Sequence, residues 1–368
     1  MVFNFMKQST SFSPSIQKPV RIWLLLGLVM VLGQIFIGGV TRLTDSGLSI
    51  TEWEVVSGVL PPLNATQWDD AFKAYKVAAS RQHEVLHATM SLQEFKWIYF
   101  WEYFHRLWAR CMGLVFIIPF LWFLIKKWIP RWLTRRLGWV ILLAAAQATM
   151  GWIMVKSGLN DDTRTWVSAY KLVYHLSLAT ILLGILYNTY LHAQYGSQPS
   201  DLARIKEDKI FHVSGGLLLL QIVLGGFMAG MRAGLIHNVW PVAIDIQGFL
   251  HLFSYDTANW TDYEANIAVK AWVQVAHRST AIILVVVFIF LAKRYYKKYT
   301  RSVRALCVFL GIQYGLGVLT LIYAIGSIPL LYGSLHQLVA MGLVMSLLHL
   351  HYSMHIFHAS QNSDVLSE

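Results

Sequence analysis

Eight long apolar runs divide this chain of 368 residues and restrict its fold more than any other feature. A helix of about 20 apolar residues crosses the hydrocarbon core of a bilayer, and its backbone hydrogen bonds are satisfied internally. Only 13% of the residues are charged, whereas about a quarter are charged in a soluble domain. The sequence therefore predicts an all-α membrane protein with eight transmembrane helices, over residues 21–41, 104–125, 136–155, 170–192, 210–231, 270–292, 303–325 and 331–353.

The net charge of +11 is concentrated in short connections between these runs. The connections 126–137 and 293–304 contain Lys and Arg but no acid, whereas 233–269 contains acids but no Lys or Arg. Short basic loops stay in the cytoplasm, so both termini are predicted to lie inside and the long loops 42–101 and 233–269 outside. The basic excess is thus a topology signal and does not indicate a nucleic-acid partner. The first run is too long for a cleaved signal peptide, and we expect it to be retained.

Landmarks of the first four runs recur in the same order in the last four. The matched residues are Gln34 and Gln221, His105 and His277, Gln147 and Gln313, and His175 and His336. The offset falls from 187 residues for the first match to 161 for the last, as the connections shorten. The chain is therefore predicted to form two tandem four-helix bundles, 1–200 and 201–368, related by a pseudo-twofold axis along the membrane normal.

Each odd-numbered run carries a Gln four residues before a Gly. The simpler interpretation is packing, because small residues let helices approach and an amide can hydrogen-bond across the interface. The alternative is that the glycines leave room for a flat cofactor.

Four histidines lie on the even-numbered runs, near their outer ends: His105, His175, His277 and His336. The topology places them at one depth, as one pair in each half. Neutral imidazole is a good ligand for haem iron, and helical bundles build cofactor sites from facing helices. A single intramembrane histidine more often bonds to a neighbouring helix, but two matched pairs favour bis-histidine haem ligation. A zinc site would need three or four clustered ligands.

The other histidines form two groups, which we interpret as solvated or interfacial rather than as metal sites. They are His83 and His87 in the first outer loop, and His349, His351, His355 and His358 at the inner end of the last run. The two cysteines, Cys111 and Cys307, lie within runs, so no disulfide is expected in the outer loops.

The two halves differ beside their histidines. Glu102 precedes His105 by three residues and Gln274 precedes His277 by three, so each shares a helical face with its histidine. An acid near the membrane boundary is a functional candidate, and the simpler alternative is an interfacial pair with Arg106. We therefore predict chemistry beside Glu102 in the first half and a permanent electron-transfer haem in the second.

Two further features lie at the outer side. Four arginines lie near the outer helix ends: Arg42, Arg106, Arg110 and Arg278. They could pair with haem propionates, and snorkelling to the membrane interface explains them equally well. The first outer loop is expected to cover the first half as a lid, through Trp53, Pro61, Pro62, Trp68 and Trp97.

Several motifs resemble the haem A synthase family in its mitochondrial and proteobacterial type. They are Gly38-Gly39-Val40-Thr41-Arg42-Leu43-Thr44, Glu102-Tyr103-Phe104-His105-Arg106, the segment from Gly151 to Leu159, Ala229-Gly230, His277-Arg278 and His336-Gln337. The matches extend over about residues 33 to 340, nearly the whole chain. One branch of the family carries a cysteine pair in the first outer loop, and this chain lacks it.

The resemblance implies an oxidoreductase that converts the C8 methyl of haem O stepwise into a formyl group, giving haem A for terminal cytochrome oxidase. It implies that His277 and His336 bind the iron of a resident haem b, and that His105 and His175 hold the substrate haem iron. Glu102 is the implied catalytic acid, and we assign Arg278 to cofactor binding.

The expected partners are haem O and haem A, the lipid bilayer, haem O synthase and an electron donor that the sequence does not identify. The sequence does not decide whether the protein forms a homo-oligomer. The expected location is the bacterial inner membrane, or the mitochondrial inner membrane in a eukaryote, with the haem sites toward the outer face.

Two other classes stay open. One is a dihaem cytochrome b that exchanges electrons with quinone, with Glu102 as a proton acceptor. The other is a repeat-built transporter, which would show no haem absorption. A prenyl transferase is disfavoured because its paired aspartate motifs are missing.

Overall fold

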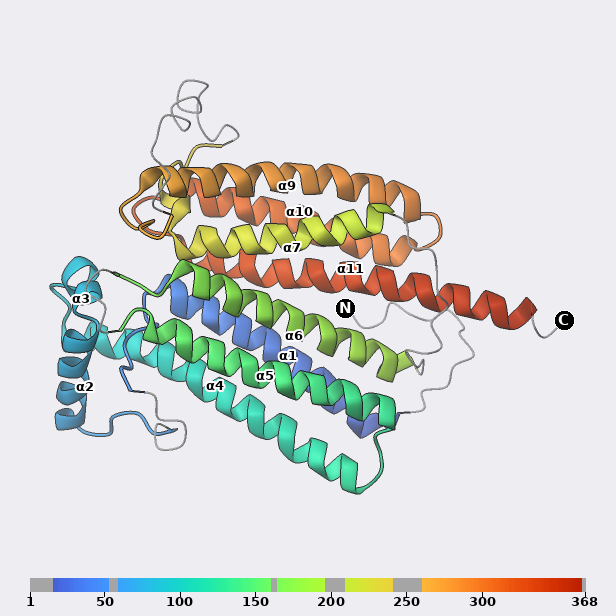
Figure 1. Ribbon diagram of the computed structural model, residues 1–368, viewed down its shortest axis with the longest axis horizontal. Coiled ribbons are helices and arrows are strands. Elements are labelled where there is room, and N and C mark those ends of the chain that lie inside the picture. Colours follow the sequence, from blue (N-terminus) through green and yellow to red (C-terminus); the bar gives the residue numbers. More distant parts are fainter. Residues whose placement is uncertain (1–15, 53–58, 160–163, 196–208, 241–259, 366–368) are drawn as a thin grey trace.

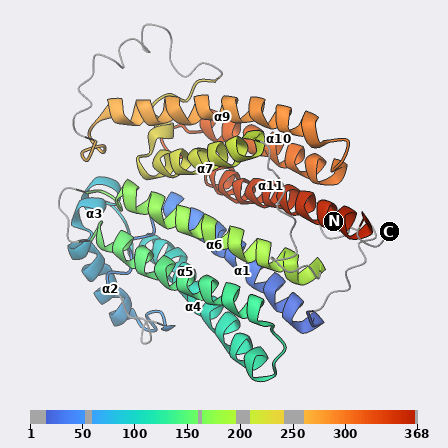
Figure 2. The same cartoon turned by 45° about the vertical axis from the view of Figure 1, so that its right-hand side comes forward.

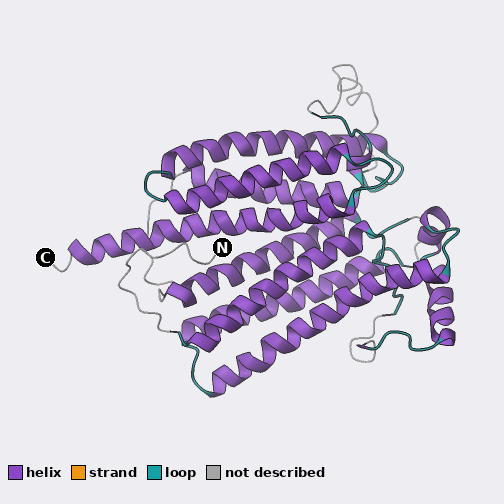
Figure 3. Cartoon of the chain, turned by 180° about the vertical axis from the view of Figure 1, so that it is seen from behind, coloured by secondary structure: helices purple, strands orange, loops and turns teal. Residues whose placement is uncertain are grey.

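Eight long helices dominate the protein (Figure 1). The computed structural model describes residues 16–52, 59–159, 164–195, 209–240 and 260–365, and in these ranges it contains helices and loops but no strand (Figure 3). The long helices are α1 (Lys18–Leu43), α4 (Leu92–Ile125), α5 (Arg131–Lys156), α6 (Ala169–Tyr195), α7 (Lys209–Gly230), α9 (Ile267–Tyr295), α10 (Thr300–Ile322) and α11 (Leu330–Val365). All eight are long and apolar enough to cross a membrane, which confirms the predicted fold class.

Helix α4 begins twelve residues before the apolar run that predicts it. Ser91 caps it: its hydroxyl accepts a hydrogen bond from the backbone N–H of Glu94, and the Glu94 carboxylate accepts one from the backbone N–H of Ser91. Such a capping box satisfies amides that the first helical turn would otherwise leave without partners. Glu102 and His105 therefore lie inside one continuous helix.

Two short helices, α2 (Ala65–Ala78) and α3 (Ser80–Leu86), lie where α1 ends and α4 begins (Figure 1). We call this end of the bundle the outer end. An apolar cluster around Leu48, Phe72, Tyr75, Phe95 and Val167 joins these short helices to the outer ends of α4 to α6. Trp68, predicted to belong to a lid, packs against this cluster, whereas Trp97 is exposed and Trp53 lies outside the described residues.

The long helices pack in two groups that meet along four central helices. Figure 2 shows α4 and α5 on one side, α9 and α10 on the other, and α1, α6, α7 and α11 between them. Contacts between the groups join α1 to α11 and α6 to both α7 and α11. The apolar core lies among these helices and includes the fully buried Leu24, Leu183, Phe288, Leu306 and Leu350. This packing is consistent with the predicted tandem bundles.

Both cysteines are free and exposed on the helix surfaces, at Cys111 in α4 and Cys307 in α10.

Candidate functional site

Each of the four predicted histidines lies against a Gln and a Gly of the long helix that precedes it. In the first half, the amide nitrogen of Gln34 lies 3.2 Å from Nε2 of His105, and that of Gln147 lies 3.2 Å from Nε2 of His175. In the second half, the corresponding distances are 3.3 Å from Gln221 to His277 and 3.3 Å from Gln313 to His336. One arrangement therefore recurs four times.

The glycine of each motif gives its imidazole the space it occupies. A Cβ atom at Gly38 or Gly151 would lie 3.0 Å from Cε1 of His105 or His175. At Gly317 it would lie 2.9 Å from Cε1 of His336, and at Gly225 3.4 Å from that of His277. The packing interpretation of this motif is therefore confirmed, and the side chains that the Gln and Gly contact are the candidate ligands themselves. The alternative, that the glycines leave room for a flat cofactor, stays a prediction.

Both ring nitrogens of His336 contact Gln313. Nδ1 donates to the backbone carbonyl of Gln313 at 3.1 Å, so the lone pair is on Nε2, where it faces the Gln313 side-chain amide at 3.3 Å. Nε2 could bind a metal only if this amide turned away. A metal-binding histidine characteristically has a second contact like that of Nδ1, which fixes its tautomer and orientation. The amide oxygen of each of the four glutamines is buried and has no partner among the described residues. Buried polar atoms seldom stay unpaired, so these oxygens mark places suited to a further polar contact.

A cavity of about 480 Å³ lies among the helices of the second half. His277 and His336 line it together with mainly apolar side chains, and Arg42, Arg232 and Arg278 also contribute to its wall. Cavities of this size hold large organic ligands. Two imidazoles, apolar walls and several guanidinium groups fit the iron, the macrocycle and the carboxylates of a haem.

Glu102 is buried and fully hydrogen-bonded at the outer end of the first half. One carboxylate oxygen accepts a hydrogen bond from Arg106 at 2.6 Å. The other accepts from the hydroxyl of Ser49 at 2.8 Å and from the backbone N–H of Ile50 at 2.9 Å. The predicted alternative, a pair with Arg106, is therefore present, and the carboxylate also fixes the loop that follows α1.

Gln274 holds the equivalent loop in the second half. Its amide nitrogen donates to the backbone carbonyl of His237 at 2.7 Å, and His237 follows Ile50 by 187 residues, the offset of the repeat. Glu102 and Gln274 therefore both fix a loop by hydrogen bonds, but the direction of these bonds is opposite. The carboxylate accepts from its loop, whereas the amide donates to its loop.

An arginine follows each of these residues by four positions, and the two arginines make equivalent contacts. Arg106 donates to the backbone carbonyl of Glu52 at 3.0 Å, and Arg278 donates to that of Val239 at 2.9 Å. Of the four arginines predicted near haem carboxylates, Arg42 and Arg278 line the second-half cavity, Arg106 binds Glu102, and Arg110 lies outside the cavity lining. Sequence reasoning missed Arg232 and Asp45, although both lie at positions that the repeat offset relates.

The interpretation of the outer-loop histidines as solvated was wrong for His87. Its Nδ1 lies 2.6 Å from the hydroxyl of the fully buried Tyr75, which also donates to Gln82 at 3.2 Å. Burial lowers the pKa of His87 below its usual value. This network stabilises the packing of the short helices α2 and α3.

The inner-end histidines are also less exposed than predicted. His349 lies 3.0 Å from the hydroxyl of Tyr187, and His351 and His355 face each other with their Nε2 atoms 3.1 Å apart. His355 is buried. The side chain of His358 lies outside the described residues, and within them no group of three or more side chains is arranged to hold a metal ion.

The fold and site define a multi-pass helical membrane protein with two pairs of intramembrane histidines. Residues 21–348 match the family described as "Cytochrome oxidase assembly protein". The chain belongs to this family.

Several relatives of this chain are named "Heme A synthase". The protein of Flavobacterium psychrophilum is 38% identical over 329 residues, which cover 88% of this chain and 94% of that protein. The protein of Nitrosospira multiformis is 38% identical over 338 residues, which cover 90% and 92% of the two chains. That of Rhodospirillum centenum is 37% identical over 351 residues, covering 92% and 90%. These similarities confirm the family resemblance that the motifs indicate.

Proposed function

We propose that this protein is a haem A synthase, an oxidoreductase that converts the C8 methyl of haem O into a formyl group. Its product would be haem A for terminal cytochrome oxidase. Family membership supports the reaction, since relatives that match about nine-tenths of the chain are named "Heme A synthase". The observation that carries the proposal is the recurrence of four Gln-held histidines, with Glu102 three residues before His105 where Gln274 stands three residues before His277.

The second half would hold a resident haem b. His277 and His336 would bind its iron, and the Gln221 and Gln313 amides that contact their Nε2 atoms would then turn away. The backbone carbonyl of Gln313 would keep His336 oriented through Nδ1. Arg278 and the other guanidinium groups of the cavity would bind its carboxylates, and the apolar walls would keep water from the iron. When bound, this haem supplies one-electron transfer.

The first half would take haem O as its substrate, with His105 and His175 holding the substrate iron. Two successive oxidations of the methyl would give an alcohol and then a hydrated aldehyde, which loses water. Each would add one oxygen atom with dioxygen as the oxidant, and two electrons from the donor with two protons would reduce the second oxygen atom to water. Glu102 would accept the proton released at the methyl, and its fixed hydrogen bonds would keep the carboxylate in one position. Arg106 and Ser49 position this acid.

The family relationship favours this activity over a dihaem cytochrome b that exchanges electrons with quinone. The distribution of charge supports an inner-membrane protein with cytoplasmic termini and the haem sites toward the outer face. Haem O synthase and a separate electron donor would be its functional partners.

Haem extraction tests the reaction directly. Cells that make the full-length protein together with haem O synthase should contain extractable haem A, whereas cells making haem O synthase alone should contain only haem O and haem b. A purified protein with a haem absorption band but no haem A in these cells would contradict the proposal and favour the cytochrome.

A further inference from the structure

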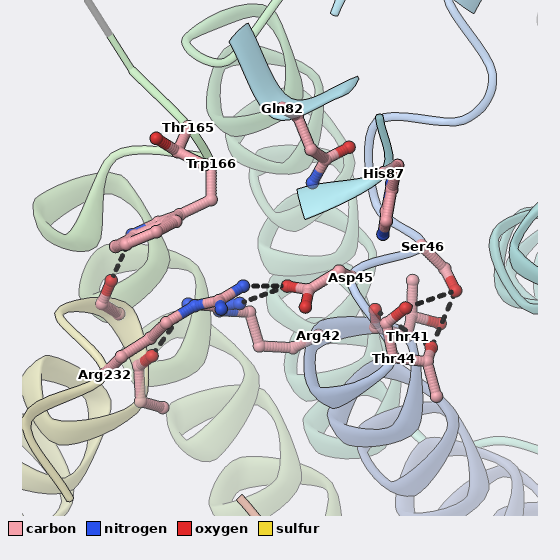
Figure 4. Close-up of polar contacts among 12 residues, drawn as sticks. Thr41, Arg42, Thr44, Asp45, Ser46, Gln82, His87, Thr165, Trp166 and Arg232 are labelled. Atoms are coloured by element: carbon pink, nitrogen blue, oxygen red, sulfur yellow. Dashed lines mark hydrogen bonds and ion pairs between the residues drawn. The ribbon is translucent and has the colours of Figure 1, made fainter. Parts of the chain in front are cut away.

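The outer ends of α1 and α7 are joined by an arginine–aspartate cluster (Figure 4). Asp45 forms ion pairs with Arg42 and with Arg232. Arg42 also donates to the backbone carbonyl of Ala229 at 2.9 Å. Two cross-half contacts therefore meet at this cluster.

Both contacts join residues that the repeat makes equivalent. Ala229 follows Arg42 by 187 residues, and Arg232 follows Asp45 by the same number. A residue can meet its own counterpart only close to a twofold axis, so the cluster marks the place where the halves are joined. Asp45 and Arg232 also share an uncommon backbone, with φ of 55° and 54° in the left-handed region.

The cluster faces the second-half cavity. Arg42, Asp45 and Arg232 all line it, and their side chains are only 14%, 22% and 20% exposed. Trp166 fixes the guanidinium group of Arg232, whose carbon lies 4.3 Å from the ring centroid. The indole N–H of Trp166 in turn donates to the backbone carbonyl of Gly230 at 2.8 Å.

The charges of the cluster do not cancel. Two guanidinium groups share the single carboxylate of Asp45, and Nε of Arg42 is buried without a partner among the described residues. The cavity wall therefore presents an excess positive charge and a free donor, which suits a second carboxylate brought by a ligand.

The cluster is also connected to Glu102. Asp45 begins the loop 45–50, whose Ser46 is fixed by a backbone hydrogen bond to Thr41 at 3.0 Å. Ser49 and Ile50, at the other end of this loop, donate to the Glu102 carboxylate at 2.8 and 2.9 Å. A short segment, fixed at both ends, thus runs from the wall of the second-half cavity to the candidate acid of the first half.

We propose that Asp45 is a positioning residue that couples the two halves. It shares Arg42 and Arg232 with a carboxylate of the haem in the second half, and through the loop 45–50 it holds Glu102 in place. This inference rests on the proposed function. The haem carboxylates and Asp45 then bind to the same two guanidinium groups, so the charge of Asp45 acts on both sites.

Replacing Asp45 by Asn separates a coupling role from a merely structural one. The variant keeps the shape of the side chain but removes one negative charge from beside the haem. Because reduction lowers the charge of a haem, the midpoint potential of the second-half haem should shift to a more positive value. Turnover of haem O should fall at least tenfold, because the loop that holds Glu102 loses its ion pairs with Arg42 and Arg232.

Three measurements on the purified full-length protein test these effects: a spectroscopic redox titration, hydrogen exchange of the loop 45–50 and the yield of haem A. Exchange should become faster in Asp45→Asn, and Asp45→Glu should restore it. Asp69→Asn is the matched control, because Asp69 pairs with Lys73 on the exposed surface of α2, and it should behave as the wild type in all three. Unchanged potential and exchange in Asp45→Asn would overturn the proposal.

A charge exchange provides an independent test if the single variant folds poorly. The double variant Asp45→Arg with Arg232→Asp keeps one acid and one base at two positions that already share a left-handed backbone. It should return turnover to within about threefold of the wild type, whereas Arg232→Asp alone should not. Failure of the double variant to exceed either single variant would contradict the coupling.

A separate result would refute the resident haem itself. A wild-type haem spectrum that survives replacement of both His277 and His336 would refute the resident haem, and the coupling with it. A spectrum that depends on these histidines, together with a midpoint potential and a loop exchange that Asp45→Asn leaves unchanged, would refute the coupling alone.

Discussion

At the scale of single residues, Glu102 and Gln274 show how one chemical group changes the use of a repeated position. Both are buried and both hold the loop after a preceding helix. Their spacing from the histidines was predictable from the sequence, as was the pairing of Glu102 with Arg106. The contacts with Ser49 and Ile50 were not, because the path of a loop leaves no periodic pattern in the sequence.

Glu102→Gln is the informative replacement at this position. Removing the side chain would leave Arg106 without its buried partner, which costs about 3–5 kcal/mol of stability. The amide keeps the size and can still accept from Ile50, but it cannot take up a proton. We expect haem A formation to fall by about 100-fold or more while the second-half haem stays bound. Haem extraction and the absorption spectrum measure the two effects, and full activity would sink the assignment of Glu102.

At the scale of helices, hydropathy was sufficient to predict all eight spans but not the start of α4. Its outer turns are less apolar than a membrane span, and the capping box of Ser91 and Glu94 continues the helix into the outer segment. The Gln-x-x-x-Gly motif was visible in the sequence as a repeat. Its function was not, because only packing shows which side chain lies over each glycine.

Helix α10 offers a matched pair of replacements at this scale. Gly317→Ala would place a Cβ 2.9 Å from Cε1 of His336, whereas at Gly315 a Cβ meets nothing within 4 Å. Alanine is the better helix former by about 1 kcal/mol, so both variants should gain local helix stability. Only Gly317→Ala should lose haem from the second half. The haem-to-protein ratio after purification measures this, and equal loss in Gly315→Ala would exclude a specific role of Gly317.

At the scale of the whole molecule, the two halves share an architecture and differ in what we propose they bind. The resident haem should therefore depend on one pair of histidines alone. Replacing His277 or His336 by Ala should remove most of the haem b spectrum. Replacing His105 or His175 should leave that spectrum intact and abolish haem A formation. Spectra and haem extraction of the four variants measure this, and equal spectral loss in all four would argue against separate resident and substrate sites.

The ion pair between Asp45 and Arg232 has a consequence for how such a molecule can be built. In a dimer of identical subunits, a residue at the symmetry axis meets a copy of itself, so an acid there would face an acid and a base would face a base. Here the counterparts carry opposite charges. That contact is available only when the two halves differ in sequence, as they do in this chain. Asp45 and Arg232 can therefore attract each other at a position where a charged residue of a symmetric homodimer would be repelled by its own copy.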